Sequence, residues 1–214
     1  MLATLMGIRG DRARSVLIDN AERLFAEHGI EAVSLRDVSK AAGQRKHSAA
    51  QYHFGDRAGL VAAVYEARMG TINARRAEHV RELRAEGRER DLDALVAAIV
   101  VPLVDFVTES HGWYGRFLAR THWDTFAGRV LADLDVRSSL REVLGHLTDL
   151  MSDLPAAVRR SRLEHVNTLL IGTVAGSEWA HDRGDRTLSA QFLTSDLIAT
   201  SVAILTAASA PAFT

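Results

Sequence analysis

Apolar residues recur along this chain at the spacing of helices rather than of strands. Within residues 12–28, Leu17, Ala21 and Phe25 fall on one side of a helix, and Gly29 follows where a glycine commonly ends one. Helical periodicity continues to the C-terminal end, without the alternation that marks strands and without a repeat of roughly 20–50 residues. The pattern predicts an all-α fold of about nine helices.

Two short helices are predicted after the first. Ser34 stands three residues before Asp37, the spacing of a capping box, and Gly43 ends the helix that Ser34 opens. A polar segment, residues 44–47, precedes a short Ala-rich helix that ends near Tyr52. Two short helices joined by such a turn form the unit that lays its second helix in the major groove of DNA.

Longer helices are predicted over the rest of the chain. Asp56 suits the N-cap of a long fourth helix, Pro102 is placed to kink or divide a later one, and Pro155 suits a first turn. The helical segments cover residues 57–85, 92–109, the aromatic-rich stretch 112–127, 136–152, about 155–181 and about 188–208.

Composition narrows the class of protein. Of the 214 residues, 47% are hydrophobic and 25% charged, enough apolar surface for a normal core. The absence of cysteine excludes thiol catalysis, disulfides and cysteine metal sites, and fits a reducing cytosol. Residues 1–10 do not read as a signal peptide, and no stretch reaches the roughly 18 apolar residues of a membrane span. We therefore expect a cytoplasmic protein.

Charge is distributed unevenly along the chain. Residues 1–90 carry an excess of Arg and Lys, whereas residues 91–214 carry an excess of Asp and Glu. The N-terminal end is thus the better place for an anionic partner, although an imbalance of this size also arises by chance.

Residues 15–65 resemble the DNA-binding domain of TetR-family transcriptional regulators. The resemblance rests on four segments: residues 21–29 (AERLFAEHG), 33–38 (VSLRDV) with 41–43 (AAG), 52–54 (YHF) and 56–60 (DRAGL). It implies a three-helix helix-turn-helix domain at residues 1–57 and, joined to it by the long fourth helix, a helical domain for dimerisation and ligand binding at residues 58–214.

The resemblance also implies a set of DNA contacts. It places Tyr52 and Arg57 at phosphates, Ser34 beside the backbone, and the exposed face of the second short helix at the bases. Tyr52 can alternatively be a core residue and Arg57 a solvated cation. The candidate DNA-binding residues are Ser34, Arg36, Arg45, Lys46, His47, Ser48, Ala49, Gln51, Tyr52 and Arg57.

Three departures from the family pattern leave the base-reading register open. The segment from Gly43 to Phe54 is one residue longer than the common pattern, Gln44 and Arg45 replace a usual valine, and Gln51 stands where the first of two aromatics is usual. Glutamine pairs with adenine and arginine with guanine. Which of these side chains reach base edges does not follow from the sequence.

The last two long helices are the candidates for a dimer interface. They carry apolar residues with small glycines that permit close helix approach, as in a four-helix interface between two subunits. Both helices can alternatively belong to an intramolecular core. The candidate interface residues are Leu163, Val166, Leu170, Gly172, Val174, Gly176, Phe192, Leu197, Val202 and Leu205.

An aromatic cluster is the candidate ligand pocket. Apolar walls with a few polar groups are typical of small-molecule sites, although aromatics at this spacing are more often simple core. The candidate lining is Phe106, Trp113, Phe117, Arg120, His122, Trp123, Phe126 and Trp179. The histidines are scattered without the spacing of a metal site, so we predict neither a metal nor a cofactor.

The function predicted is a dimeric, sequence-specific repressor that binds a palindromic duplex operator and is released by a hydrophobic or aromatic small molecule. One alternative is a ligand-independent DNA-binding regulator or an activator. Another is a small helical enzyme, which is disfavoured because the chain has no G-x-S-x-G, P-loop or H-E-x-x-H motif.

Overall fold

A computed structural model describes residues 2–132, 134 and 138–208, and these residues form helices only. The predicted all-α fold is confirmed, with ten helices over the described residues in place of about nine. They are α1 (Leu2–His28), α2 (Leu35–Ala41), α3 (Ala49–Phe54), α4 (Arg57–Ala85), α5 (Leu92–Ser110), α6 (Tyr114–His122), α7 (Thr125–Ala132), α8 (Ser138–Leu150), α9 (Ala156–Asp182) and α10 (Ala190–Thr206).

The additional helix comes from the aromatic-rich stretch. Residues 112–127 divide into α6 and α7 because Asp124 opens a new helix: its side chain accepts a hydrogen bond of 2.8 Å from the N–H of Ala127. Pro102, in contrast, lies inside α5 without dividing it, and His111, which follows the last residue of α5, has a left-handed backbone (φ 47°). Helix α1 begins at Leu2, well before the predicted start at residue 12.

The chain forms two compact units. Unit 1 comprises Met1–Gly70 and Gly112–Asp135, and unit 2 comprises Thr71–His111 and Val136–Thr214. Unit 1 therefore contains α1, α2, α3, the first part of α4, α6 and α7. The predicted domains, 1–57 and 58–214, are functional assignments, and their boundary stays a prediction.

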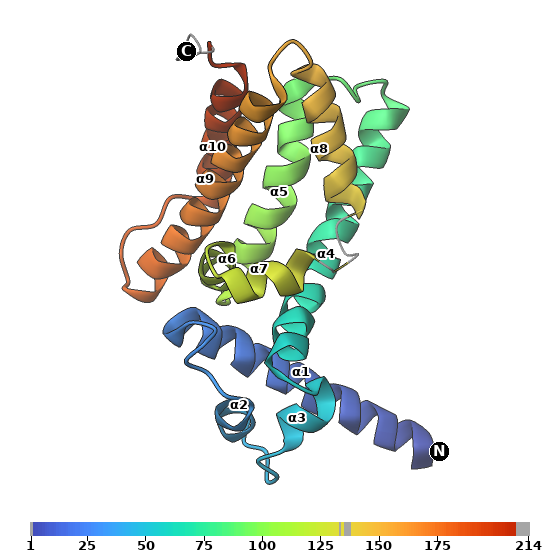
Figure 1. Ribbon diagram of the computed structural model, residues 1–214, viewed down its shortest axis with the longest axis vertical. Coiled ribbons are helices and arrows are strands. Elements are labelled where there is room, and N and C mark those ends of the chain that lie inside the picture. The colour runs from blue at the N-terminus through green and yellow to red at the C-terminus, as the bar shows by residue number, and fades with distance from the viewer. Residues whose placement is uncertain (1, 133, 135–137, 209–214) are drawn as a thin grey trace. The chain divides into compact units, whose positions relative to one another are not determined.

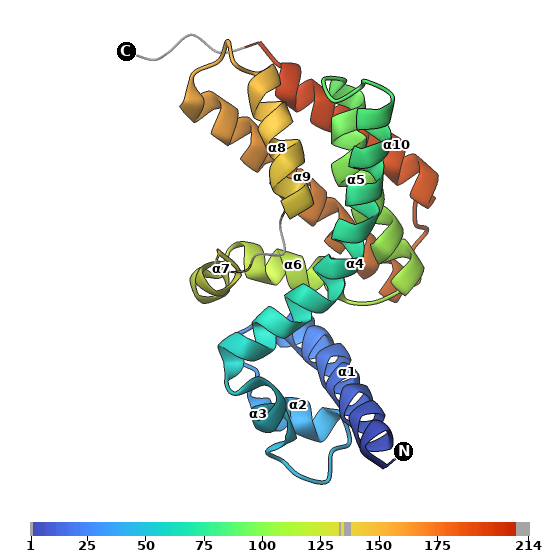
Figure 2. The ribbon, with the colours of Figure 1, turned by 90° about the vertical axis from the view of Figure 1, so that its right-hand side faces the viewer.

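Unit 1 is built around α1. Helix α1 packs against α2, α3 and α6, with Leu17, Ala21 and Phe25 fully buried on its inner face. From α6, Phe117 is fully buried and its ring centre lies 6.2 Å from that of Phe25. The two short helices α2 and α3 lie beside α1 (Figures 1 and 2). The apolar stripe read from the sequence is therefore the buried face of α1.

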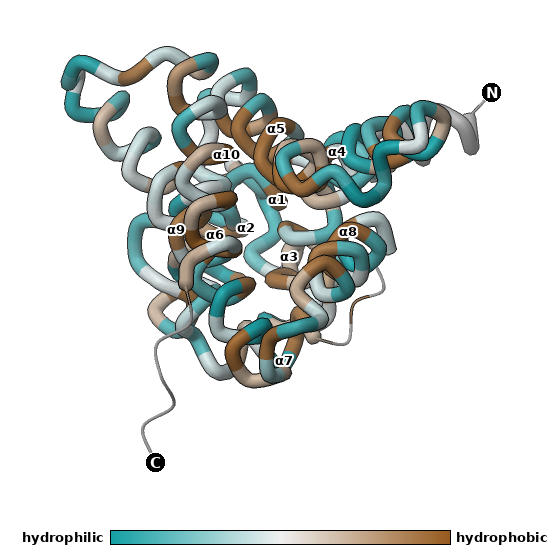
Figure 3. The backbone as a smooth tube through the Cα atoms, turned by 90° about the horizontal axis from the view of Figure 1, so that it is seen from above, coloured by the Kyte–Doolittle hydropathy of each residue, from teal (hydrophilic) through white to brown (hydrophobic). Residues whose placement is uncertain are grey.

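Unit 2 is built around α5. This helix packs against α8, α9 and α10, and it is hydrophobic over much of its length (Figure 3). Its buried residues include Leu95, Val96, Val100 and Val104. Because α5 is apolar on several sides, it needs neighbours on several sides, which the three surrounding helices supply.

Candidate nucleic-acid interface

The start of α2 is fixed by a capping box. The Ser34 hydroxyl oxygen accepts a hydrogen bond of 3.2 Å from the N–H of Asp37, and the Ser34 N–H donates to the Asp37 carboxylate at 3.1 Å. The side-chain and backbone hydrogen bonds from Ser34 lower the pKa of Asp37. The cap predicted from the sequence is thus present, and it sets the first turn of α2 at an exposed position.

A buried hydrogen bond holds α2 against α3. The Ser39 hydroxyl donates to the Leu35 carbonyl at 2.9 Å and accepts from the N–H of Ala50 at 3.0 Å. Ser39 and Ala50 have no exposed surface, so the two short helices approach closely at small side chains. Gly43, with φ 65°, turns the chain between them in a conformation that favours glycine. This contact fixes the helix-turn-helix angle.

Helix α3 is short and begins later than the candidate cations. Arg45, Lys46 and His47 lie in the turn before Ala49, not on the helix, and all three are exposed. On α3 itself, Ala50 faces the core, whereas Gln51 and Tyr52 are exposed, Tyr52 at 86%. An aromatic side chain with so much exposed surface is not a core residue.

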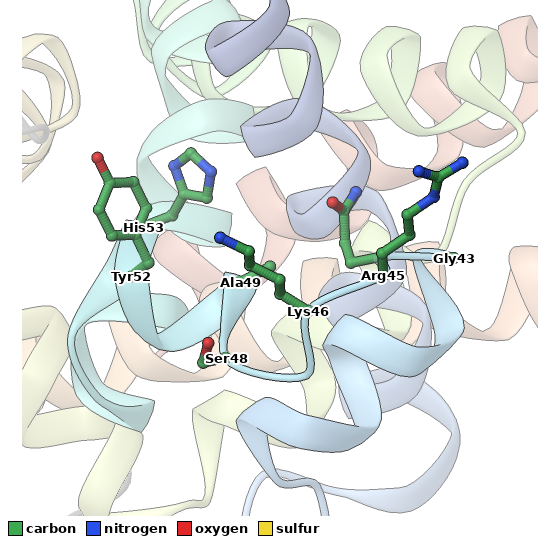
Figure 4. Close-up of a pocket in the computed structure, with 8 residues that line it drawn as sticks. Gly43, Arg45, Lys46, Ser48, Ala49, Tyr52 and His53 are labelled. Carbon is green, nitrogen blue, oxygen red and sulfur yellow. The ribbon is translucent and has the colours of Figure 1, made fainter.

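The turn and α3 enclose a hollow, which we call the α3 hollow. Its volume is about 500 Å³, and its lining residues are Gly43, Gln44, Arg45, Lys46, Ser48, Ala49, Tyr52 and His53. Figure 4 shows Lys46 reaching over Ala49 toward Tyr52 and His53, while Arg45 points the other way. The Tyr52 and His53 rings meet edge to face at 5.3 Å. The hollow thus combines cations, a phenol and an imidazole at an open surface.

The exit from α3 is tightly built. Gly55 has φ 76°, and the Asp56 carboxylate accepts a hydrogen bond of 2.8 Å from the N–H of Gly59, so Asp56 caps α4 as predicted. A Cβ added at Gly59 would overlap the carbonyl oxygen of Phe54. The first turn of α4, with the half-buried Arg57, therefore lies directly against the end of α3.

A buried carboxylate joins three helices of unit 1. Glu22 of α1 is 4% exposed, and its carboxylate accepts hydrogen bonds from Arg68 Nε of α4 at 2.5 Å and from the N–H of Trp113 at 3.0 Å. Arg68 also pairs with Asp19 at 2.6 Å. Burial opposes the charge of Arg68, but attraction to Glu22 and hydrogen bonds with both carboxylates outweigh it and raise the pKa of Arg68.

Sequence reasoning missed this buried group. The available signal was Glu22 itself, since it lies four residues after Ile18 and three before Phe25, on the apolar side of α1. A charged residue in that place needs a partner. The partner, Arg68, is 46 residues away and could not be named from spacing.

The candidate ligand residues divide between the two units. In unit 1, Phe117 is fully buried, whereas Trp123 is 74% exposed and its ring meets that of His122 at 4.4 Å. Trp113 lies under the Arg116 guanidinium at 3.7 Å, and Arg120 donates to the Ala26 carbonyl at 3.3 Å. Phe126 is half-buried in unit 1, and Phe106 and Trp179 belong to unit 2. A pocket formed by the eight residues stays a prediction.

The candidate interface residues on α9 and α10 differ in exposure. Five are buried within the single chain: Val166, Leu170, Val174, Leu197 and Leu205. Leu163 and Val202 are half-buried, and Gly172, Gly176 and Phe192 are exposed. Phe192 is 53% exposed, with Trp179 at 48% and Leu188 at 59% on the same pair of helices and their connection.

Within the described residues, no group of three or more histidine or acidic side chains has the arrangement of a metal site. None of the helices described combines the length and the apolar character that crossing a membrane requires.

The geometry of α1, α2 and α3 defines a helix-turn-helix protein, the class whose second short helix enters DNA.

Comparison with known proteins agrees with this class. Residues 17–64 match the family described as "Bacterial regulatory proteins, tetR family". The resemblance seen in the sequence is thus confirmed over residues 17–64, which match this family of regulatory proteins and contain the helix-turn-helix. No curated protein matches the chain in sequence.

Two solved structures are similar to the chain over most of its length. One is the fatty acid degradation regulator FadR from Bacillus halodurans, with 14% identity, a TM-score of 0.52, and coverage of 88% of this chain and 94% of that one. The other is the superantigen pfit, with 19% identity, a TM-score of 0.49 and 87% coverage of each chain. The likeness to FadR shows a shared fold.

Proposed function

We propose that the chain is a dimeric repressor that binds a palindromic operator through α3 and the turn before it, and that a small apolar ligand releases it. The observation that carries the DNA contact is the α3 hollow. Arg45, Lys46 and Tyr52 present cations and a hydroxyl at an open surface, which is the chemistry that holds phosphate. Ser34, Arg36, His47 and Arg57 extend the proposed contact surface.

Exposed apolar and small residues support the dimer. Gly172 and Gly176 are exposed on α9, and a Cβ added at either meets nothing within 4 Å. The exposed side chain of Phe192 lies on the neighbouring helix α10. Two copies of this helix pair would bury these surfaces together, and a two-fold dimer would set the two α3 helices about 34–36 Å apart, one turn of DNA.

The oligomeric state tests this part of the proposal. Gly172→Leu places a bulky side chain where the single chain has room, so the subunit should fold but the dimer should weaken. Gly145→Leu on α8, where an added Cβ also meets nothing within 4 Å, is the matched control. Sedimentation should give a dimer for the wild type and the control and a monomer-shifted equilibrium for Gly172→Leu. A monomeric wild type at micromolar concentration would refute the dimer.

Ligand release is the remaining part of the proposal. A ligand that binds one conformer of the subunit better lowers operator affinity only by its differential affinity for the two conformers. The half-buried aromatic residues Trp113 and Phe126 of unit 1 support an apolar ligand. A panel of apolar and aromatic compounds added to the operator complex should contain one that releases DNA. Unchanged operator binding with every compound would favour the ligand-independent regulator.

The same DNA-binding helices can serve a repressor or an activator. A reporter gene placed behind the operator distinguishes the two, because its expression falls with a repressor and rises with an activator. The chain acts without catalysing a reaction, and it acts in the cytoplasm, where its DNA partner is accessible.

Sequence-preferring binding to its own upstream DNA in a gel-shift assay is the primary test. A folded dimer without such binding would refute the proposed function.

A further inference from the structure

The side chains of α3 divide among three directions. Successive residues of an α-helix are turned by about 100°, so residues four apart, such as Ser48 and Tyr52, point nearly the same way. Ala50 faces the core, and Ser48 and Tyr52 therefore form the outward ridge. Ala49 and His53 flank this ridge on the side of the α3 hollow. Gln51 lies on the opposite flank, outside the hollow.

The hollow suits the sugar-phosphate backbone better than base edges. Base edges lie on the floor of the major groove and are reached by protruding side chains, whereas the backbone is a ridge that fits a concave surface. Lys46 reaches toward Tyr52 across this hollow (Figure 4), which brings an ammonium and a phenol to one place. Both groups donate hydrogen bonds to phosphate oxygens.

Gln51 is the polar side chain of α3 that lies outside the hollow and can contact a base. It is exposed, and among the described residues its amide makes no hydrogen bond. A helix about 10–12 Å across fills a major groove about 12 Å wide. When the hollow side of α3, with Tyr52 at its edge, rests on the backbone, the opposite flank that carries Gln51 therefore faces the bases.

We propose that Gln51 selects an adenine in each half-site, while the α3 hollow, through Lys46 and Tyr52, seats the sugar-phosphate backbone and is indifferent to sequence. The amide of glutamine offers one acceptor and one donor in the arrangement that matches N6 and N7 of adenine. This inference rests on the proposed DNA-binding function, because it assigns roles within that interface.

Selection from random duplexes tests the role of Gln51. The wild type should recover a half-site with an adenine at one position. Gln51→Ala should lose preference at that position, with a fall of about 5–150-fold in discrimination, and keep it elsewhere. Gln51→Arg should recover guanine there, because arginine pairs with O6 and N7 of guanine. Unchanged circular dichroism shows that the variants fold.

Salt dependence tests the role of the hollow. Lys46→Met should weaken binding to all duplexes equally and reduce the slope of log K against log salt by about 0.9, the contribution of one phosphate contact. Arg90→Met removes an exposed charge from the connection between α4 and α5, and it should leave the slope unchanged.

The outcomes separate this inference from the proposed function. A wild type that selects no sequence refutes the proposed function. A wild type that selects a sequence, together with a Gln51→Ala variant that keeps every preference, overturns the inference alone. A Lys46→Met variant that changes base preference would show that the hollow reads bases, and would overturn the division between backbone and base contacts.

Discussion

Two glycines of α4 should respond in opposite ways to the same substitution. Gly59 lies in the first turn and Gly70 in the middle of the helix. Replacing a glycine inside a helix by alanine ordinarily stabilises a protein by about 0.5–1 kcal/mol. At Gly70, which is exposed and has nothing within 4 Å of an added Cβ, this gain should appear in full.

At Gly59 the gain should be outweighed. An added Cβ would overlap the Phe54 carbonyl oxygen and lie 3.2 Å from the carbonyl carbon, and both are backbone atoms that cannot rotate away. The first turn of α4 must then move, at a cost of about 1–3 kcal/mol for overpacking. The same movement weakens the cap that joins Asp56 to the Gly59 N–H, worth about 1 kcal/mol. The net effect should be a loss of about 1–3 kcal/mol.

Urea and thermal unfolding followed by circular dichroism measure both variants. A change of 1 kcal/mol in the free energy of unfolding moves the thermal midpoint, Tm, of a chain of this size by about 2–4 °C. Gly70→Ala should therefore raise the Tm by a few degrees, and Gly59→Ala should lower it and reduce DNA affinity, because α3 shifts with its exit. If both variants were stabilised equally, the close approach of α3 and α4 would be refuted.

Further substitutions probe unit 1 and its caps. Glu22→Ala removes the buried acceptor of a guanidinium and a backbone N–H, and it should lower the free energy of unfolding in urea by about 3–5 kcal/mol. Glu66→Ala, at an exposed site of α4, should change that free energy by no more than about 0.5 kcal/mol. Equal effects of the two substitutions would contradict the buried pair. The lowered pKa of Asp37 means that its cap stabilises the protein at neutral pH and is lost as pH falls through that pKa, so Asp37→Asn should flatten the acid limb of stability against pH. An unaltered acid limb would count against the capping box. Phe117→Ala should lower the free energy of unfolding by about 3–5 kcal/mol and Trp123→Ala by less than about 1 kcal/mol. A larger loss for Trp123→Ala than for Phe117→Ala would contradict the burial of Phe117 in the core.

Local signals predicted the helices well. The Ser34 and Asp56 caps and the glycines after α1 and α2 all act within a few residues, so spacing alone was sufficient to place them. The predicted segment 112–127 does not contain the break between α6 and α7, although Asp124 inside it is an ordinary capping residue. Pro102 was expected to kink or divide α5, and the helix continues through it.

The site was predictable in composition but not in arrangement. The candidate cations and Tyr52 follow from the sequence, but the position of Arg45 and Lys46 before α3 depends on where that helix begins. That start is fixed by the buried contact between Ser39 and Ala50, which joins residues 11 apart. The hollow is a product of this long-range contact, and local spacing gives no account of it.

Binding of the wild-type chain to its selected operator across a salt series tests the central claim most directly, with a scrambled duplex of equal length as the competitor. At physiological salt the operator should bind at least about 10³-fold more tightly than the scrambled duplex, and log K should fall linearly with log salt for both. Equal affinity for the two duplexes, or affinity that does not change with salt, would contradict a regulator that holds the DNA backbone in the α3 hollow and reads bases beside it.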